Sequence, residues 1–171
     1  RQDERVLAEV YRYTKTFDPL RPCIDTSGLY HVVTDIFDVH DYEQEVGKFA
    51  SHYRGDGPYL TYPDRQTYRG EPYMVSEYGG ARWEPKGGPG WGYGSDPRSE
   101  DEFAARYEAL THTLLQTDYC CGFCYTQLYD IEQERNGLYT YARERKFSQA
   151  VYDRIRKANT ETAAIEKRLR R

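Results

Sequence analysis

The sequence predicts an α/β protein with parallel strands, on three observations. Segments with the spacing of amphipathic helices alternate with short apolar runs typical of strands, and this alternation implies parallel pairing. Tyrosine supplies 18 of the 171 residues, and aromatic residues make up 15% of the chain, a content that disordered proteins lack. Neither an internal repeat nor a linker divides the chain. We therefore expect residues 1–171 to belong to a single domain.

The first half of the chain contains two predicted helices around two predicted strands. Apolar residues recur on one side of the first helix, and Pro19 ends it. Glycine and proline at positions 55–58 break the second helix. In chain order, the expected elements are a helix at 3–17, strands at 22–25 and 32–39, and a helix at 43–53.

The second half continues the alternation around one long irregular segment. Ser99 and Glu102 form a capping box, which marks the start of a helix. The Gly-, Pro- and Trp-rich loop shows neither the helical nor the strand period of apolar residues, and loops of this length are usually functional or disordered. The expected elements are a strand at 72–76, a loop at 79–97, a helix starting at 99, a strand at 120–128 and a helix at 148–170.

Charge and hydropathy argue against two classes of partner. The net charge is -4 and the only basic run is the short one at 167–171, so we expect no nucleic-acid partner. No apolar stretch approaches the ~20 residues that a membrane span needs, so we expect no membrane partner. The chain shows no signal peptide, which leaves its location unknown, with the cytoplasm favoured.

The four cysteines are Cys23, Cys120, Cys121 and Cys124. The last three fall in the predicted strand at 120–128, which we expect to be buried, and free cysteine is commonly a small core residue. No histidine lies close to them in sequence. We therefore expect neither a zinc cluster nor a disulfide framework, and no cofactor.

Three of the predicted strands end in polar and aromatic residues, at positions 40–42, 76–80 and 125–127. In a parallel α/β barrel the active site forms at the carboxyl ends of the strands, so these residues are expected to meet. Glu77 is the carboxylate in the second group. From spacing alone, a catalytic carboxylate and a salt-bridged carboxylate in a turn are equally compatible with this position.

Residues 75–80 resemble the nucleophile motif of glycoside hydrolase family 2, which contains β-galactosidases, β-glucuronidases and β-mannosidases. Stretches at 18–28, 34–42 and 122–130 are similar to the same catalytic barrel, in the family's order. The resemblance implies the C-terminal half, about strands 5–8, of a (β/α)8 TIM barrel. It also implies a retaining β-glycosidase, which hydrolyses O-glycosidic bonds through a covalent glycosyl-enzyme.

The resemblance implies roles for individual residues. Glu77 matches the nucleophile. Tyr42 falls near the family's sixth-strand tyrosine, which orients the nucleophile, and His40 is the rival for that position and a candidate sugar contact. Tyr78 lies within the nucleophile motif, and Tyr125 stands where the family commonly has a tryptophan, so both are candidate contacts for substrate.

Other candidates come from the residues themselves. Trp83 and Trp91 in the long loop are candidate stacking surfaces for a sugar, and a small core within the loop is the equal alternative. His31 and His40 are candidate contacts for sugar hydroxyls, although a lone histidine is more often structural. Arg82 is the only basic residue near the motif, so we expect a neutral β-linked saccharide or glycoside rather than a uronide.

The family's acid/base is a glutamate preceded by asparagine, and neither Asn136 nor Asn159 is followed by glutamate. The resemblance therefore puts the acid/base outside this chain, in the rest of a parent barrel, and the isolated chain is expected to be inert or nearly so. Half a barrel exposes two strand edges, so self-association is also expected. The alternative is a non-catalytic carbohydrate-binding module, usually an antiparallel β-sandwich.

Overall fold

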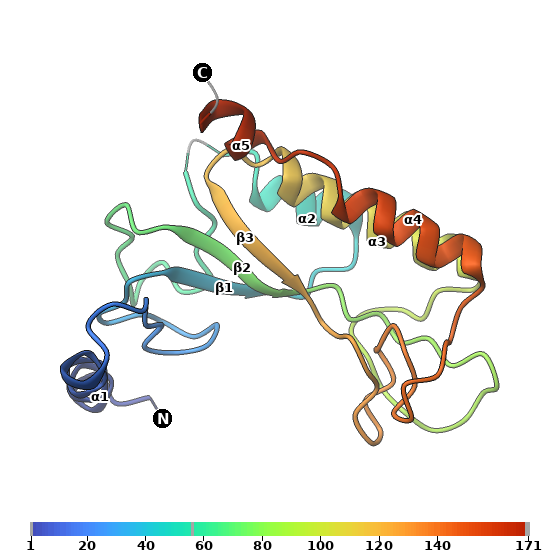
Figure 1. Cartoon of the computed structure of the whole chain (residues 1–171), viewed down its shortest axis with the longest axis horizontal. Coiled ribbons are helices and arrows are strands. Elements are labelled where there is room, and N and C mark those ends of the chain that lie inside the picture. The colour runs from blue at the N-terminus through green and yellow to red at the C-terminus, as the bar shows by residue number, and fades with distance from the viewer. Residues whose placement is uncertain (1, 56, 170–171) are drawn as a thin grey trace.

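The computed structural model describes residues 2–55 and 57–169, and within them the predicted α/β class with parallel strands is confirmed (Figure 1). The elements in chain order are α1 (Glu4–Phe17), β1 (Phe37–Asp41), α2 (Val46–His52), β2 (Tyr73–Tyr78), α3 (Glu100–Gln116), β3 (Cys120–Tyr125), α4 (Gln149–Asn159) and α5 (Ala164–Leu169). The three strands form one sheet in the order β1-β2-β3. The antiparallel sandwich expected of a carbohydrate-binding module is not the observed fold.

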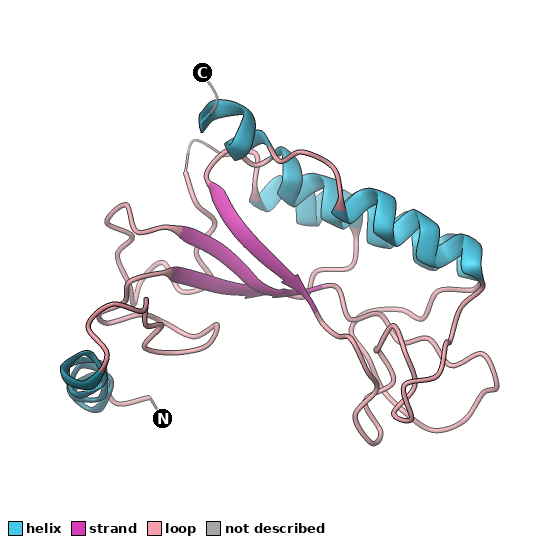
Figure 2. Cartoon of the chain, viewed as in Figure 1, coloured by secondary structure: helices cyan, strands magenta, loops and turns pink. Residues whose placement is uncertain are grey.

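Helices cover one face of the sheet. Figure 2 shows α2, α3 and α4 on the same side of the strands, with α1 set apart from them at the other end of the molecule. The long loops that follow β2 and β3 gather beyond the carboxyl ends of the strands (Figure 1). Among the described residues, no helix combines the length and the hydropathy needed to span a bilayer.

The main core lies between the sheet and helices α2 and α3. Its members alternate along the strands because every second side chain of a strand points to the same face. The cluster consists of Phe37, Val39, Phe49, Tyr53, Tyr73, Val75, Tyr78, Leu110, Leu114 and Cys120. A second cluster joins α3 to α4 beneath the long loops, and consists of Ala81, Phe103, Ala104, Tyr107, Phe147, Val151 and Ile155.

The helix starts follow the sequence signals. Asp3 caps α1 by accepting a hydrogen bond from the Arg5 amide at 3.0 Å. Ser99 caps α3, where its hydroxyl accepts from the Glu102 amide at 3.1 Å. Glu102 reaches back one residue further than a capping box requires, because its carboxylate accepts from the amide of Arg98.

The predicted strand at 22–25 is wrong, and the strand predicted at 32–39 begins only at Phe37. Side chains provide the hydrogen bonds that a neighbouring strand would otherwise supply. The Asp35 carboxylate accepts from the Cys23 amide at 2.9 Å, and the Asp25 carboxylate accepts from the Val32 amide at 2.7 Å. These bonds close the segment between α1 and β1 into loops.

Two further expectations are corrected at the C-terminal side. The helix predicted at 148–170 is interrupted after Asn159, so that α4 and α5 are separate. The predicted burial of the cysteine run holds only for Cys120, whereas Cys121 and Cys124 are exposed. They belong to β3, which among the described residues has β2 on one side and no further strand of the sheet on the other.

Candidate functional site

Glu77 lies near the carboxyl end of β2, the central strand. In strict alternation Val75 and Glu77 would share the face that packs on the helices. A bulge changes this, because Val39 of β1 pairs with Val75 while the next residue, His40, pairs with Glu77. The extra residue, Ser76, shifts the alternation and returns Glu77 to the open face. The side chain of Glu77 is 37% exposed there.

Two side chains approach one oxygen of the Glu77 carboxylate. The Tyr42 hydroxyl donates to Oε2, and Nδ1 of His40 lies 3.2 Å from the same atom. Oγ1 of Thr126, which follows β3, lies 3.5 Å from the Tyr42 hydroxyl. The carboxyl ends of all three strands therefore contribute to this group. Within residues 2–55 and 57–169, no donor is bonded to the second carboxylate oxygen, Oε1.

Tyr42 is built to remain a donor. Burial of its ring and the hydrogen bond to Glu77 raise its pKa far above the usual value of 10. The hydroxyl therefore keeps its proton, and Glu77 stays the acceptor. Gln44 holds the backbone that follows β2 in place, because its side-chain amide donates to the carbonyl of Gly79 at 2.5 Å.

An aromatic row leads outward from Tyr42. The ring of Tyr93 stacks on it, with centroids 3.5 Å apart and planes 12° apart, and Trp91 meets Tyr93 edge-on at 5.7 Å. Trp91 is 44% exposed. Trp83, in contrast, stacks on Phe147 in the packing beneath the loops. The structure therefore places Trp91, and not Trp83, in continuity with Glu77.

Tyr78 and Tyr125 point away from this group. Tyr78 is completely buried, and its hydroxyl bonds that of Thr111 at 2.7 Å on the helix side of the sheet. Tyr125 packs on the same side, with its ring centroid 4.6 Å from that of Tyr107. A side chain at Gly79 would collide with the Tyr125 ring, so this glycine makes room for a tyrosine. Neither ring is presented to the open face, contrary to the expected sugar contact.

A buried charged cluster lies behind the site. Nδ1 of His31 lies 2.6 Å from the Asp25 carboxylate, and its Nε2 lies 2.8 Å from the carbonyl oxygen and 3.1 Å from the carboxylate of Asp38. Asp38 also accepts from the hydroxyl of Ser76 and from the amide of Gly28. Burial lowers the pKa of His31, but the bonds to Asp25 and Asp38 outweigh it and raise the pKa to about 9. His31 is therefore a buried cation, not an exposed sugar contact.

A second buried ion pair fixes the loop that carries Trp91. Nζ of Lys146 donates to the Asp130 carboxylate at 2.8 Å and to the Arg135 carbonyl at 3.1 Å, with both charged side chains 1% exposed. Asp130 also accepts from the Gly137 amide. The Arg135 amide donates to the carbonyl of Trp91 at 2.9 Å. The position of Trp91 thus depends on the packing of the loop after β3.

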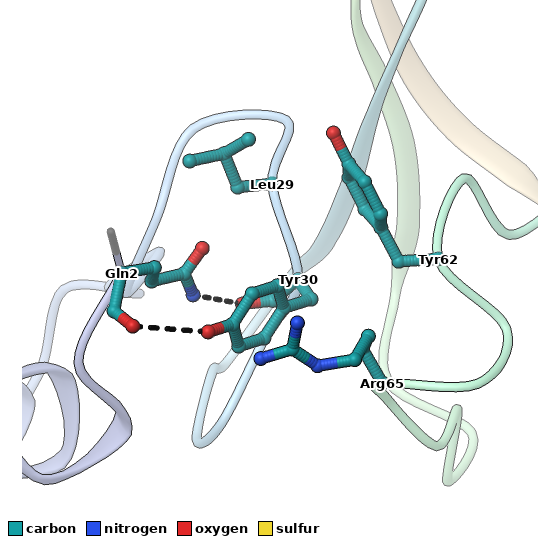
Figure 3. A pocket seen from close by; sticks show the side chains of 5 residues that line it. All are labelled: Gln2, Leu29, Tyr30, Tyr62 and Arg65. Atoms are coloured by element: carbon teal, nitrogen blue, oxygen red, sulfur yellow. Dashed lines mark hydrogen bonds between the residues drawn. The ribbon is translucent and has the colours of Figure 1, made fainter.

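Residues 2–55 and 57–169 contain no group of three or more His, Cys, Asp or Glu side chains placed to hold a metal ion. They do contain a pocket of about 630 Å³ (Figure 3). Its lining consists of Gln2, Leu29, Tyr30, Tyr62 and Arg65. The guanidinium of Arg65 stands 4.2 Å from the centroid of the Tyr30 ring. Glu77 and its partners are not in this lining, so the pocket is separate from the site.

Solved structures share the fold of this chain, whereas no known family profile and no curated protein matches its sequence. A GH2 β-galacturonidase from Eisenbergiella tayi matches over 94% of this chain and 30% of its own, with a TM-score of 0.61 and 13% identity. A β-D-glucuronidase from Dictyoglomus thermophilum matches over 94% and 29%, with a TM-score of 0.63 and 16% identity. An exo-β-agarase matches over 91% and 22%, with a TM-score of 0.63 and 12% identity.

These matches show that the chain has a fold found within glycoside hydrolases. The chain spans only 22–30% of the length of the three structures. At such identities the likeness extends to the fold alone.

Sequence reasoning missed three residues of the site. Tyr93 lies in an aperiodic loop, and nothing in its neighbourhood announces that its ring stacks on Tyr42. Asp38 and Ser76 sit in the strands as isolated polar residues, which alternation predicts to face away from the core. The alternation of side chains along the strands could have placed Asp38 and Ser76 on the same face as His40, but it does not indicate the hydrogen bond between Ser76 and Asp38.

Proposed function

We propose that this chain is the part of a retaining β-glycosidase that carries the nucleophile, as the C-terminal half of a family 2 (β/α)8 barrel. The observation that supports this most directly is the Glu77 carboxylate at the carboxyl end of the central parallel strand, with Tyr42 and His40 on one oxygen. Strand ends of this kind are where barrel enzymes place their catalytic groups. The shared fold with glycoside hydrolases agrees with this reading.

In this mechanism Oε1 of Glu77 attacks the anomeric carbon while Oε2 stays bonded to Tyr42. A donor on the non-attacking oxygen holds the carboxylate in one orientation, and its proton compensates part of the charge without removing it. A covalent glycosyl-enzyme forms and is then hydrolysed with overall retention of configuration. Trp91 would stack on a sugar ring beyond the one that reacts, because it ends the aromatic row.

The second carboxyl of the mechanism has to come from outside this chain. Retention requires an acid/base about 5–5.5 Å from the nucleophile. Asp38 is a second carboxylate close to His40, but it is 1% exposed and already contacts Ser76, Gly28 and His31. It has no free path to a leaving group. We therefore propose that a preceding part of the same polypeptide supplies the acid/base.

For substrate, we propose a neutral β-linked saccharide or glycoside. A uronate carboxylate calls for a free basic side chain. Arg82 is already engaged, since it pairs with Asp96 and donates to the carbonyl of Gly88 at 2.6 Å. Arg135 lies 3.7 Å from Asp130 and belongs to the loop packing.

The test uses the polypeptide as its gene encodes it, together with a series of aryl β-glycosides. Glu77→Gln should lower kcat/KM by about a thousandfold or more, because the nucleophile is lost. Glu132→Gln, in the exposed loop after β3, should leave kcat/KM unchanged. Hydrolysis followed by NMR should release the β-anomer first.

Azide rescue distinguishes the nucleophile from the acid/base. With Glu77→Gly, azide can occupy the vacated space and attack from the same side as the lost carboxylate, so the product should be the α-glycosyl azide. A β-glycosyl azide would instead make Glu77 the acid/base. Full activity of Glu77→Gln on every glycoside that the wild type cleaves would refute a catalytic role altogether.

A further inference from the structure

A row of alternating acidic and basic side chains leads from the interior of the molecule to Glu77. Nδ1 of His31 lies 2.6 Å from the Asp25 carboxylate and its Nε2 lies 3.1 Å from that of Asp38. Asp38 in turn lies 3.8 Å from Nε2 of His40, whose Nδ1 lies 3.2 Å from Glu77. Exposure rises from 4% or less at the three inner side chains to 22% at His40.

We propose that His31 and Asp38 are positioning residues that act through His40, so that its imidazole is held beside the Glu77 carboxylate. This inference rests on the proposed function of Glu77 as nucleophile. Neither His31 nor Asp38 touches Glu77 or the open face. Their effect is transmitted by the charge of Asp38 and by the ring that it orients.

The inner part of the row is stable as alternating charges. Two carboxylates out of reach of water are strongly unfavourable unless a cation compensates them. Three of the four close contacts of the His31 ring nitrogens are to acceptors: the Asp25 carboxylate, the Asp38 carbonyl and the Asp38 carboxylate. The fourth is the Asp38 amide at 3.1 Å. A protonated His31 therefore places one cation between the two carboxylates, which compensates part of their buried charge.

The outer part of the row leaves His40 little freedom. A Cβ on Gly28 would fall 2.2 Å from the imidazole, so the ring packs directly on that backbone, and Oγ of Ser27 lies 3.1 Å from Nε2. The carboxylate of Asp38 stands behind the same nitrogen. With one edge of the ring occupied in this way, the opposite edge faces Glu77, and Nδ1 lies 3.2 Å from its carboxylate.

The same strand carries a pair that serves as a matched control. Asp41 of β1 is 4% exposed, lies 2.7 Å from Nδ1 of His52 and accepts from the hydroxyl of Tyr53. This pair faces the helix side of the sheet, where Tyr53 belongs to the core. Asp38→Asn and Asp41→Asn therefore remove equivalent buried charges, and only the first lies in the row that reaches Glu77.

The first measurement is imidazole ¹⁵N NMR of the full polypeptide at neutral pH, with signals assigned by single His→Gln variants. Both nitrogens of His31 should be protonated. Asp38→Asn should shift the ¹⁵N signals of His40, whereas Asp41→Asn should leave them in place. Should Asp38→Asn fail to fold, His31→Gln serves the same comparison. Unchanged His40 signals in both variants, or an equal shift in Asp41→Asn, would overturn the proposal.

The second measurement separates positioning from mere stabilisation. Both Asp→Asn variants should melt at a lower temperature than the wild type. At a temperature where all are folded, Asp38→Asn should lower kcat about tenfold to a hundredfold with little change in KM, and Asp41→Asn should change neither. If the wild type cleaves no glycoside, the proposed function fails, while the NMR comparison still shows whether Asp38 acts on His40. If the two variants behave alike in an active enzyme, only the row is refuted.

Discussion

His31 is a charged side chain with almost no access to water, and its ionisation should be visible in stability. Its pKa is raised from 6.5 to about 9 in the folded state. Its contribution is therefore complete below pH 6.5 and is lost as the pH rises through 9. We expect the free energy of unfolding to fall by about 2 kcal/mol between neutral pH and pH 10 because of this one group.

The measurement is urea unfolding at a series of pH values, for the wild type and for His31→Gln. The loss at alkaline pH should be smaller in the variant, since other groups that titrate there are common to both proteins. His52→Gln should retain the full loss. An identical pH dependence in the wild type and in His31→Gln would mean that His31 is neutral in the folded protein.

At the same scale, the sequence identified some of the group at Glu77 and not the rest. His40, Tyr42 and Glu77 were recognisable because polar residues at the ends of parallel strands have to meet. The stacking of Tyr93 on Tyr42 depends on the path of an aperiodic loop, which no local pattern encodes. Tyr78 was misjudged because its neighbour in the motif faces the open side, while the bulge sends Tyr78 to the core.

At the scale of the elements, periodicity predicted helices better than strands. Residues 100–116 and 149–159 form helices whose buried side chains follow the predicted spacing. The apolar run at 22–25 is indistinguishable by composition from a strand. The backbone of Cys23 instead donates to the Asp35 carboxylate and accepts from the Thr34 hydroxyl and the Asp35 amide, an outcome that depends on the fold around it.

The loop that carries Trp91 should depend on the buried pair of Asp130 and Lys146. Lys146→Met removes the cation that is bonded to the Asp130 carboxylate, which is 1% exposed, and leaves only the more distant Arg135 beside it at 3.7 Å. Breaking a buried pair in this way costs about 3–5 kcal/mol. We expect a lower melting temperature and a change in tryptophan fluorescence, because the loop after β3, which contains Asp130, also bonds the backbone of Trp91 through Arg135. Thermal denaturation followed by both signals measures this.

Two further variants test the cause. Arg156→Met breaks a pair with Asp153 in which the arginine is 76% exposed, so it should leave both signals unchanged within error. The double variant Asp130→Asn/Lys146→Met removes both charges and should recover part of the lost stability. No recovery would indicate that shape, and not charge, makes Lys146 important.

At the scale of the whole molecule, helix α1 presents apolar side chains to solvent. Figure 1 shows α1 apart from the other helices, and Tyr11 and Lys15 bond it to Asp35. Its apolar residues form an outward stripe of Val6, Val10, Tyr13 and Phe17, which are 57–74% exposed. An apolar stripe of this kind usually marks an interaction surface.

We predict that the stripe on α1 drives self-association of the isolated 171-residue chain. Replacing Val10 and Phe17 with lysine should raise the dissociation constant about tenfold or more, because each apolar side chain contributes on the order of 1.5 kcal/mol when buried. Sedimentation velocity over a range of concentrations measures this. Tyr141→Lys, in a loop position that is 67% exposed, is the control and should leave association unchanged.

Repeating the sedimentation measurement on the polypeptide that the gene encodes shows what covers the stripe on α1. If a preceding half-barrel covers α1 there, the longer protein should stay monomeric, and the lysine variants should destabilise it instead of dissociating it. If the stripe belongs to a contact between copies, the longer protein should associate as strongly as the short one. A wild-type 171-residue chain that remains monomeric at its highest soluble concentration would contradict the predicted self-association, because the stripe on α1 would then stay in water without driving contacts between copies.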